Sequence, residues 1–165
     1  MDARSEAALA TVNPALADKV RAAAATLLAA STYLLVVSGL RTAAEQNALY
    51  AQGRAAPGHV VTNAKAGQSM HNYGLAVDVV PYLSGPAGAL NWQASTEQFE
   101  AMVAAMKDQG LIWGGDWVSF KDYDHFQMSN VPVNPNSAMI GDYGAGDQVA
   151  LQTIWTNAAG GKYTA

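Results

Sequence analysis

Two histidines and one aspartate are the residues of this chain whose types and spacing could do chemistry together. The chain has no cysteine and three histidines, so any metal ion must be held by imidazole and carboxylate groups. Asp78 stands in the apolar run 75–80, where a carboxylate is costly to bury unless it is paired or bound to a metal. His71 precedes it across a glycine that permits a turn, and His125 begins a second short apolar stretch.

Two imidazoles and one carboxylate with an open fourth position are typical of a catalytic zinc site, and the chain can assemble no other such set readily. The spacing by itself leaves an alternative open, in which both histidines are satisfied by hydrogen bonds and Asp78 by a salt bridge. The third histidine, His59, follows Pro57-Gly58 in a loop, and we expect it to be solvated.

Short helices and short strands must position these residues. Asn13-Pro14 predicts a helix start, and Thr42 with Glu45 forms a capping-box pattern before a second helix. We expect helices over 14–30, 43–52, 96–109 and near 147–156, and strands over 33–37, 74–80, 111–113 and 124–128.

Helices interspersed with short strands predict an α+β fold with a small, mainly antiparallel sheet packed with helices. Residues 54–70 are rich in Gly, Pro and Asn and predict a long loop, and 84–89 predict a turn-rich connector. We expect one domain over 1–165, with its motif-bearing core at about 33–127 and the segment 128–165 packed on it.

Composition excludes several classes of protein. The net charge is -4 and the basic residues are scattered singly, which argues against nucleic acid as a partner. The stretch 22–40 is uncharged, but an alanine-rich helix followed by a buried strand explains it better than membrane insertion. The N-terminus lacks the basic and apolar segments of a secretory signal, so we expect no Sec-type export, and we expect a monomer.

Three blocks of sequence resemble the M15 metallopeptidases, the family of D-Ala-D-Ala carboxypeptidases and L-alanyl-D-glutamate endopeptidases that acts on peptidoglycan. Residues 69–78 match its S-x-H-x-x-G-x-A-x-D signature, 38–46 resemble its S-G-x-R-[ST]-x-x-x-Q block, and 113–126 resemble its closing W-G-G-x-W and acid-x-x-His-Phe block. The likeness is strongest to the phage-endolysin branch, and it implies the small α+β fold shared with Hedgehog signalling domains.

The resemblance also implies a role for each matching residue. It makes His71, Asp78 and His125 ligands of Zn²⁺, Asp122 the general base, and Arg41 the group that stabilises the oxyanion. Ser69 and Gln46 would help to bind or orient the substrate.

Two carboxylates compete for the role of base, because Asp124 also precedes His125. Neighbouring strand residues face opposite ways, so Asp124 should look away from a metal bound by His125. The family's acid stands three residues before the histidine, and this favours Asp122.

The function that the resemblance implies is zinc-dependent cleavage of peptidoglycan stem peptides between L-Ala and D-Glu, as in phage endolysins that lyse the host. Such enzymes accumulate in the host cytoplasm and reach the wall through a holin pore. Two alternatives remain: a D,D- or L,D-carboxypeptidase on the same scaffold, and a non-catalytic, zinc-containing module that binds peptidoglycan.

Overall fold

The computed structural model of the chain describes residues 1–82, 95–144 and 148–164. Its strands are β1 (Tyr33–Ser38), β2 (Ala76–Tyr82), β3 (Leu111–Trp113) and β4 (His125–Met128). They form one antiparallel sheet in the order β1-β2-β4-β3. With the helices around it, this sheet confirms the predicted α+β class.

The described residues fall into two compact units. The first comprises 1–39 and 76–128 and holds the sheet, and the second comprises 40–75 and 129–165. That all 165 residues form one domain therefore stays a prediction.

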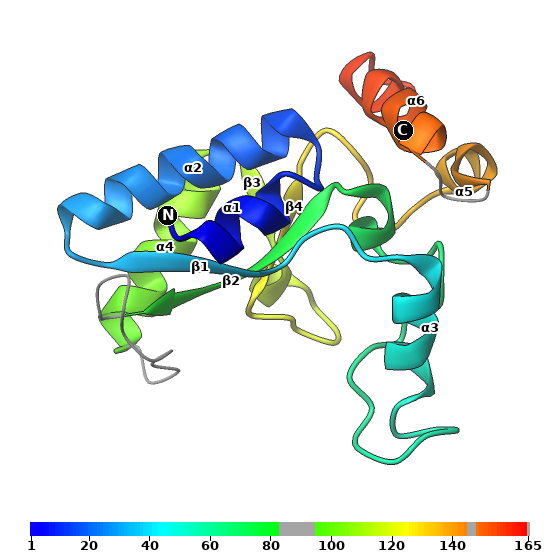
Figure 1. Ribbon diagram of the computed structural model, residues 1–165, viewed down its shortest axis with the longest axis horizontal. Helices are drawn as coiled ribbons and strands as arrows, with labels where there is room; N and C mark the ends of the chain where they lie inside the picture. The colour runs from blue at the N-terminus through cyan, green and yellow to red at the C-terminus, as the bar shows by residue number, and fades with distance from the viewer. Residues whose placement is uncertain (83–94, 145–147, 165) are drawn as a thin grey trace. The chain divides into compact units, whose positions relative to one another are not determined.

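The first unit packs helices on its sheet. These helices are α1 (Ala3–Leu9), α2 (Pro14–Ala29) and α4 (Thr96–Asp108). In this unit α2 packs against α4, and α1 lies along β1 (Figure 1). The Asn13 side chain accepts hydrogen bonds from the amides of Ala15 and Leu16, so the predicted start of α2 is confirmed. The sequence reasoning did not foresee α1.

The apolar spacing of residues 96–109 predicts Phe99, Val103 and Met106 on the inner face of α4. Met102, Ala105 and Met106 are buried, whereas Phe99 and Val103 are only half-buried. The helix ends before Gly110, whose positive φ of 73° suits a residue without a Cβ. The predicted connector 84–89 lies outside the described residues.

Strand β2 is longer at its end than the sequence suggested. The strand was predicted over 74–80, ending before Pro81, but Pro81 pairs with Leu34 and the strand continues to Tyr82. The ladder to β4 covers only 76–78, so on that side of β2 there is no ladder bond for Pro81 to lose. The strand begins at Ala76 rather than Gly74, because Gly74 adopts a left-handed conformation that ends the preceding turn of 3-10 helix.

The second unit is built from α3 (Ala43–Ala51), the 3-10 helix η1 (Met70–Tyr73), α5 (Ser137–Tyr143) and α6 (Gln148–Ala159). The capping box at the start of α3 is present, with Thr42 and Glu45 bonded in both directions. The helix predicted near 147–156 is α6, and α5 was not predicted.

No described helix is long and apolar enough to cross a membrane. The uncharged stretch 22–40 divides between the end of α2 and strand β1, as the sequence predicted.

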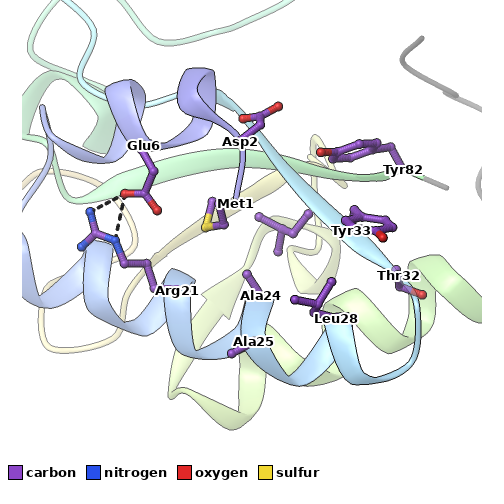
Figure 2. Close-up of a pocket in the computed structure, with 11 residues that line it drawn as sticks. Met1, Asp2, Glu6, Arg21, Ala24, Ala25, Leu28, Thr32, Tyr33 and Tyr82 are labelled. Atoms are coloured by element: carbon purple, nitrogen blue, oxygen red, sulfur yellow. Dashed lines mark hydrogen bonds and ion pairs between the residues drawn. The ribbon is translucent and has the colours of Figure 1, made fainter. Parts of the chain in front are cut away.

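A pocket of about 350 Å³ opens in the first unit, beside α2 and the start of β1 (Figure 2). Its wall is mainly apolar, with Leu28, Tyr33 and Tyr82 among the lining residues and the Glu6–Arg21 ion pair at one side. None of the residues predicted to do chemistry lines this pocket.

Candidate metal centre

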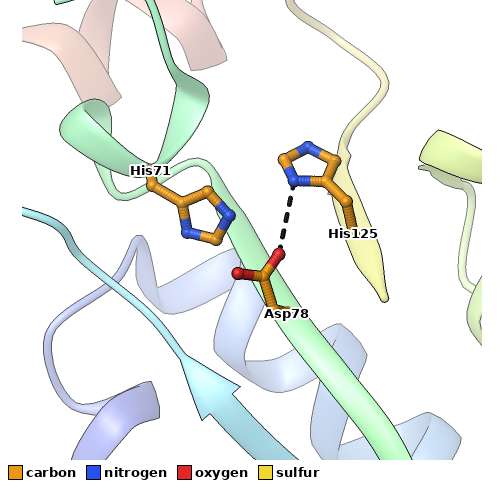
Figure 3. Close-up of side chains that lie close together, drawn as sticks. All are labelled: His71, Asp78 and His125. Carbon is orange, nitrogen blue, oxygen red and sulfur yellow. Dashed lines mark ion pairs between the residues drawn. The ribbon is translucent and has the colours of Figure 1, made fainter. Parts of the chain in front are cut away.

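The pairing of β2 with β4 brings Asp78 and His125 together. These two residues are direct cross-strand partners in the antiparallel ladder. Asp78 Oδ1 lies 3.5 Å from His125 Nδ1, and the two side chains are 18% and 6% exposed (Figure 3). A carboxylate in such a shielded position needs a cationic partner, either an imidazolium or a metal ion.

The second nitrogen of the His125 ring has a partner of its own. Nε2 lies 3.0 Å from Oε1 of Gln127, which is buried two residues further along β4 and on the same face. With Gln127 Oε1 as acceptor, the proton of a neutral ring belongs on Nε2, and the lone pair of Nδ1 is then turned toward Asp78. An outer partner of this kind is typical of a metal-ligating histidine.

His71 is supplied by the turn of 3-10 helix that precedes β2. Ser69 caps this turn, since its hydroxyl accepts from the amide of His71 at 3.4 Å, and Gly74 ends it. The ligand atoms of His71, Asp78 and His125 all lie within 4.8 Å of one another (Figure 3).

This donor set fits a metal ion. Two imidazoles and one carboxylate converge, and both rings are buried, at 2% and 5% exposure for His71 and His125. Three protein ligands that leave a coordination position open are the arrangement of catalytic zinc sites. His59 is exposed and lies outside the cluster, as the sequence predicted.

Asp122 is held close to His125 by a glycine. Its amide donates to the carbonyl of Gly114 at 3.2 Å. A Cβ added to Gly114 would clash with the carbonyl of Asp122 and would lie 3.1 Å from the Cβ atoms of both Asp122 and His125. Only a glycine therefore lets Asp122 approach β4 so closely, and the half-buried carboxylate begins next to a ligand of the cluster.

Asp124 has a different position in the ladder. Its carbonyl accepts from the amide of Val79 at 2.9 Å, so it continues the β2–β4 pairing at the residue before His125. Burial raises the pKa of its carboxyl, and the charges of Asp78 and Asp122 raise this pKa further.

Arg41 is fixed through both its side chain and its backbone. Its Nη1 donates to Oε1 of Gln46 at 2.9 Å, and its amide donates to the carbonyl of His71 at 3.0 Å. Gln46 is fully buried and also donates to the carbonyl of Ala64 at 2.7 Å. Any effect of Gln46 on a substrate would therefore be exerted through Arg41, and its predicted part in substrate binding, like that of Ser69, stays a prediction.

Sequence reasoning missed Asn72, which stands at an unspecified position of the signature. Its Nδ2 donates to the carbonyls of Arg41 and Thr42 at 2.8 and 3.4 Å, and its Oδ1 accepts from the amide of Gly67 at 3.0 Å. The side chain is 1% exposed. Its place directly after a candidate ligand was the one sequence feature that could have pointed to it.

Trp117 packs on one of the candidate ligands. Its ring lies against that of His125, with 5.0 Å between the centroids. Its indole Nε1 is buried and has no hydrogen-bond partner among the described residues. The indole of Trp113, in contrast, donates to the carbonyl of Tyr123 at 2.8 Å.

Comparisons with known proteins show which family the chain resembles. Residues 62–128, which contain all three clustered residues, match a family model described as D-alanyl-D-alanine carboxypeptidase. The chain is 39% identical over 119 residues to the peptidoglycan L-alanyl-D-glutamate endopeptidase CwlK of Bacillus subtilis, and the match covers 68% of each protein. It is 31% identical over 126 residues to the L-alanyl-D-glutamate peptidase of Listeria phage A118, covering 73% of this chain and 40% of that protein.

A solved structure has the same fold. The L-Ala D-Glu endopeptidase ChiX of Serratia marcescens superposes with a TM-score of 0.50 and 29% sequence identity, over 78% of this chain and 90% of that one. The chain belongs to the M15 family of peptidases.

Proposed function

We propose that this protein is a zinc-dependent endopeptidase that cleaves peptidoglycan stem peptides between L-Ala and D-Glu. The observation that carries the proposal is the convergence of His71, Asp78 and His125 in a chain related to endopeptidases of that specificity. The three residues would be the ligands of Zn²⁺. When bound, zinc acts as a Lewis acid on a carbonyl oxygen and lowers the pKa of a water molecule toward ~7.

Asp122 is proposed as the general base. A carboxylate held beside the cluster can accept the proton of the attacking water and pass it to the leaving amine. The tight packing of Asp122 on Gly114 supports this choice, because it fixes the backbone of Asp122 next to His125. Asp124 is the weaker candidate, because side chains alternate in direction along a strand and Asp124 directly precedes His125.

Arg41 is proposed to stabilise the carbonyl oxygen as it becomes negative. A guanidinium keeps its proton at any physiological pH, and it interacts more strongly with an oxyanion than with a neutral amide. The hydrogen bonds to Gln46 and to the His71 carbonyl support this role by restricting where the guanidinium can go.

The proposed substrate is the peptidoglycan stem peptide, and the proposed place of action is the bacterial wall. The similarity to an L-alanyl-D-glutamate peptidase of a phage supports a phage role for the protein. Host lysis, with release from the cytoplasm through a holin pore, is part of the proposal. We propose that the protein acts as a monomer.

Mass spectrometry of fragments released from purified peptidoglycan, with zinc and with a chelator, tests the proposal. New N-terminal glutamate that disappears with the chelator is the expected result. Absence of any fragment from folded, zinc-loaded protein would refute the enzyme assignment and favour a module that only binds peptidoglycan.

One observation favours a second candidate, which is a carboxypeptidase. The family model that matches residues 62–128 is described as D-alanyl-D-alanine carboxypeptidase. Free D-Ala among the products, without new glutamate N-termini, would establish this activity instead.

A further inference from the structure

We propose that Arg54 and Lys65, gathered around the ring of Tyr50, form a binding surface for an oxyanion of the bacterial wall. We call these two residues the cation pair. Only the identity of the polymer rests on the proposed function, because the affinity for anions follows from the charges and geometry of the surface itself.

The charge pattern sets this region apart. The chain has a net charge of -4, yet the 32 residues 46–77 contain no aspartate or glutamate. Neither Arg54 nor Lys65 has a carboxylate partner among the described residues. Three other cations are paired with carboxylates, in Arg21–Glu6, Lys107–Asp116 and Lys162–Asp142, whereas Lys19 and Lys121 donate to backbone carbonyls.

The two cations share one aromatic ring. The guanidinium carbon of Arg54 lies 4.2 Å from the centroid of Tyr50, and Nζ of Lys65 lies 5.3 Å from the same centroid. The ring attracts each cation, but the two positive charges repel each other. An anion bound beside the two cations would reduce this repulsion.

Arg54 is held in place by neutral oxygens. Its Nη1 donates to the carbonyls of Tyr50 and Thr62 at 2.8 and 3.0 Å, and its Nη2 donates to Oδ1 of Asn63 at 2.9 Å. These bonds fix the guanidinium without cancelling its charge. The side chain remains exposed, so the charge is accessible.

Lys65 is held through the residues on either side of it. The carbonyl of Ala64 accepts from Gln46, and the amide of Ala66 donates to Oδ1 of Asn47 at 3.1 Å. Both partners belong to α3, the helix that carries Tyr50. The loop backbone is therefore fastened beside the ring, and less backbone entropy is lost when an anion binds, although the exposed Lys65 side chain must still be ordered.

The hydrogen bonds that hold this loop also extend to Arg41, the proposed oxyanion-stabilising residue. Gln46, which holds Ala64, also accepts from Nη1 of Arg41. An anion at the cation pair would thus be bound on the hydrogen-bonded framework that positions Arg41. This continuity favours a polymer that also presents the scissile peptide.

The chemistry that fits the surface is a carboxylate or a phosphodiester. Arginine recognises both through paired N–H groups, and lysine adds a point charge. In a bacterial wall these groups come from two sources, the stem peptides and phosphate-containing polymers attached to the glycan. A comparison of intact sacculi with sacculi stripped of phosphate distinguishes them.

Equilibrium binding of the full chain to purified sacculi tests the proposal, with bound protein measured by pelleting. We expect Lys65→Gln to raise the dissociation constant about two- to five-fold at low salt, the scale of one exposed ion contact, and Lys65→Glu to raise it further. The difference from wild type should shrink as salt is added. If the difference between wild type and the Lys65 variants persists on sacculi stripped of phosphate, the anion is a carboxylate. If the difference vanishes there, the anion is a phosphodiester.

Two control variants make the test specific. Arg54→Lys keeps the charge but loses the guanidinium fork, and we expect it to bind better than Arg54→Gln. Arg4→Gln removes one exposed charge from α1 and should bind like wild type. Equal binding by wild type, Lys65→Gln and Lys65→Glu would overturn the proposal, and so would an equal loss in Arg4→Gln.

The sacculus-binding assay tests the cation pair independently of catalysis, because it needs no hydrolysis. The fragment analysis described above tests the enzymatic activity. Loss of sacculus binding in Lys65→Glu with no fragments from wild type would uphold the surface and refute the endopeptidase. Normal cleavage by wild type, together with unchanged sacculus binding in Lys65→Glu, would uphold the endopeptidase and refute the anion-binding surface.

Discussion

The candidate ligands are positioned in two different ways. In the first unit, Asp78 and His125 are placed by the backbone ladder of β2 and β4, in which each is the other's direct partner. In the second unit, His71 and Arg41 lie outside any strand, and beside the backbone bond that joins them they depend on hydrogen bonds made by the side chains of Ser69 and Asn72.

The difference has a consequence for tolerance to mutation. Ladder bonds belong to the backbone and survive most side-chain substitutions, so neighbours of Asp78 and His125 should be replaceable by residues of similar size. Side-chain bonds disappear with the side chain. We therefore expect substitutions around His71 and Arg41 to disturb the proposed site even where they leave the ligands in place.

The largest effect should come from removing a ligand. His125→Ala should lose bound zinc and all measurable peptidase activity, because only two protein ligands remain. Metal content by plasma mass spectrometry checks this, with His59→Ala as the matched control that keeps its metal. A full equivalent of zinc in His125→Ala would show that the ladder does not supply a ligand.

Removal of the proposed base should be nearly as damaging without loss of metal. Asp122→Asn is expected to keep zinc and fold but to lose about 10²- to 10⁴-fold in kcat, the usual scale for general-base catalysis. The matched variant is Asp124→Asn. If that variant loses activity while Asp122→Asn does not, the base has been misassigned.

The proposed oxyanion group in the second unit should rank next. Arg41→Ala is expected to lower kcat by about 10²- to 10³-fold, as on removal of an oxyanion donor, with little change in zinc content. Steady-state kinetics on a soluble stem peptide measures this. Rates near those of wild type would exclude Arg41 from the reaction.

The contrast between the two modes of positioning can be tested at Asn72. Asn72→Ala removes three hydrogen bonds and should lower the free energy of unfolding by about 1–3 kcal/mol, since buried polar groups lose their partners. Asn72→Asp can still accept from Gly67 but cannot donate to Arg41. If donation positions Arg41, both variants should lose kcat even when fully loaded with zinc, whereas a solely structural role predicts normal kcat for the folded fraction.

The smallest effect concerns two indoles of the first unit. Trp113→Phe removes a satisfied hydrogen bond, whereas Trp117→Phe removes a buried donor with no partner among the described residues. The ring volume lost is the same. We expect Trp113→Phe to be the less stable variant by about 1 kcal/mol in denaturant unfolding. The opposite order would mean that Trp117 has an acceptor when the protein is in solution.

Local signals in the sequence predicted most elements of the fold. The Asn13 cap and the capping box at Thr42 correctly predicted where two helices begin. The errors have physical causes. Pro81 remains in β2 because that strand has a ladder partner on one side only at this point, and α1 and α5 are too short for periodicity to reveal.

The candidate metal ligands were easier to predict than the hydrogen bonds that support the site. His71, Asp78 and His125 could be selected from the sequence because the chain has few groups that bind metal. The bridge from Gln46 to Ala64 and the three bonds of Asn72 were not predictable. An asparagine or glutamine side chain can bond to almost any nearby carbonyl or amide, and sequence does not say which one is near.

By itself, the sequence determined the class of the fold, the start of each predicted helix and the set of residues able to bind a metal, since these depend on residue type and on spacing of a few positions. The tertiary structure alone decided that Asp78 faces His125 across one ladder, that Gly114 admits Asp122, and that Arg54 and Lys65 meet at one ring. The physical reason is that these contacts join residues distant in the chain, or fix side-chain geometry, and no local propensity encodes either.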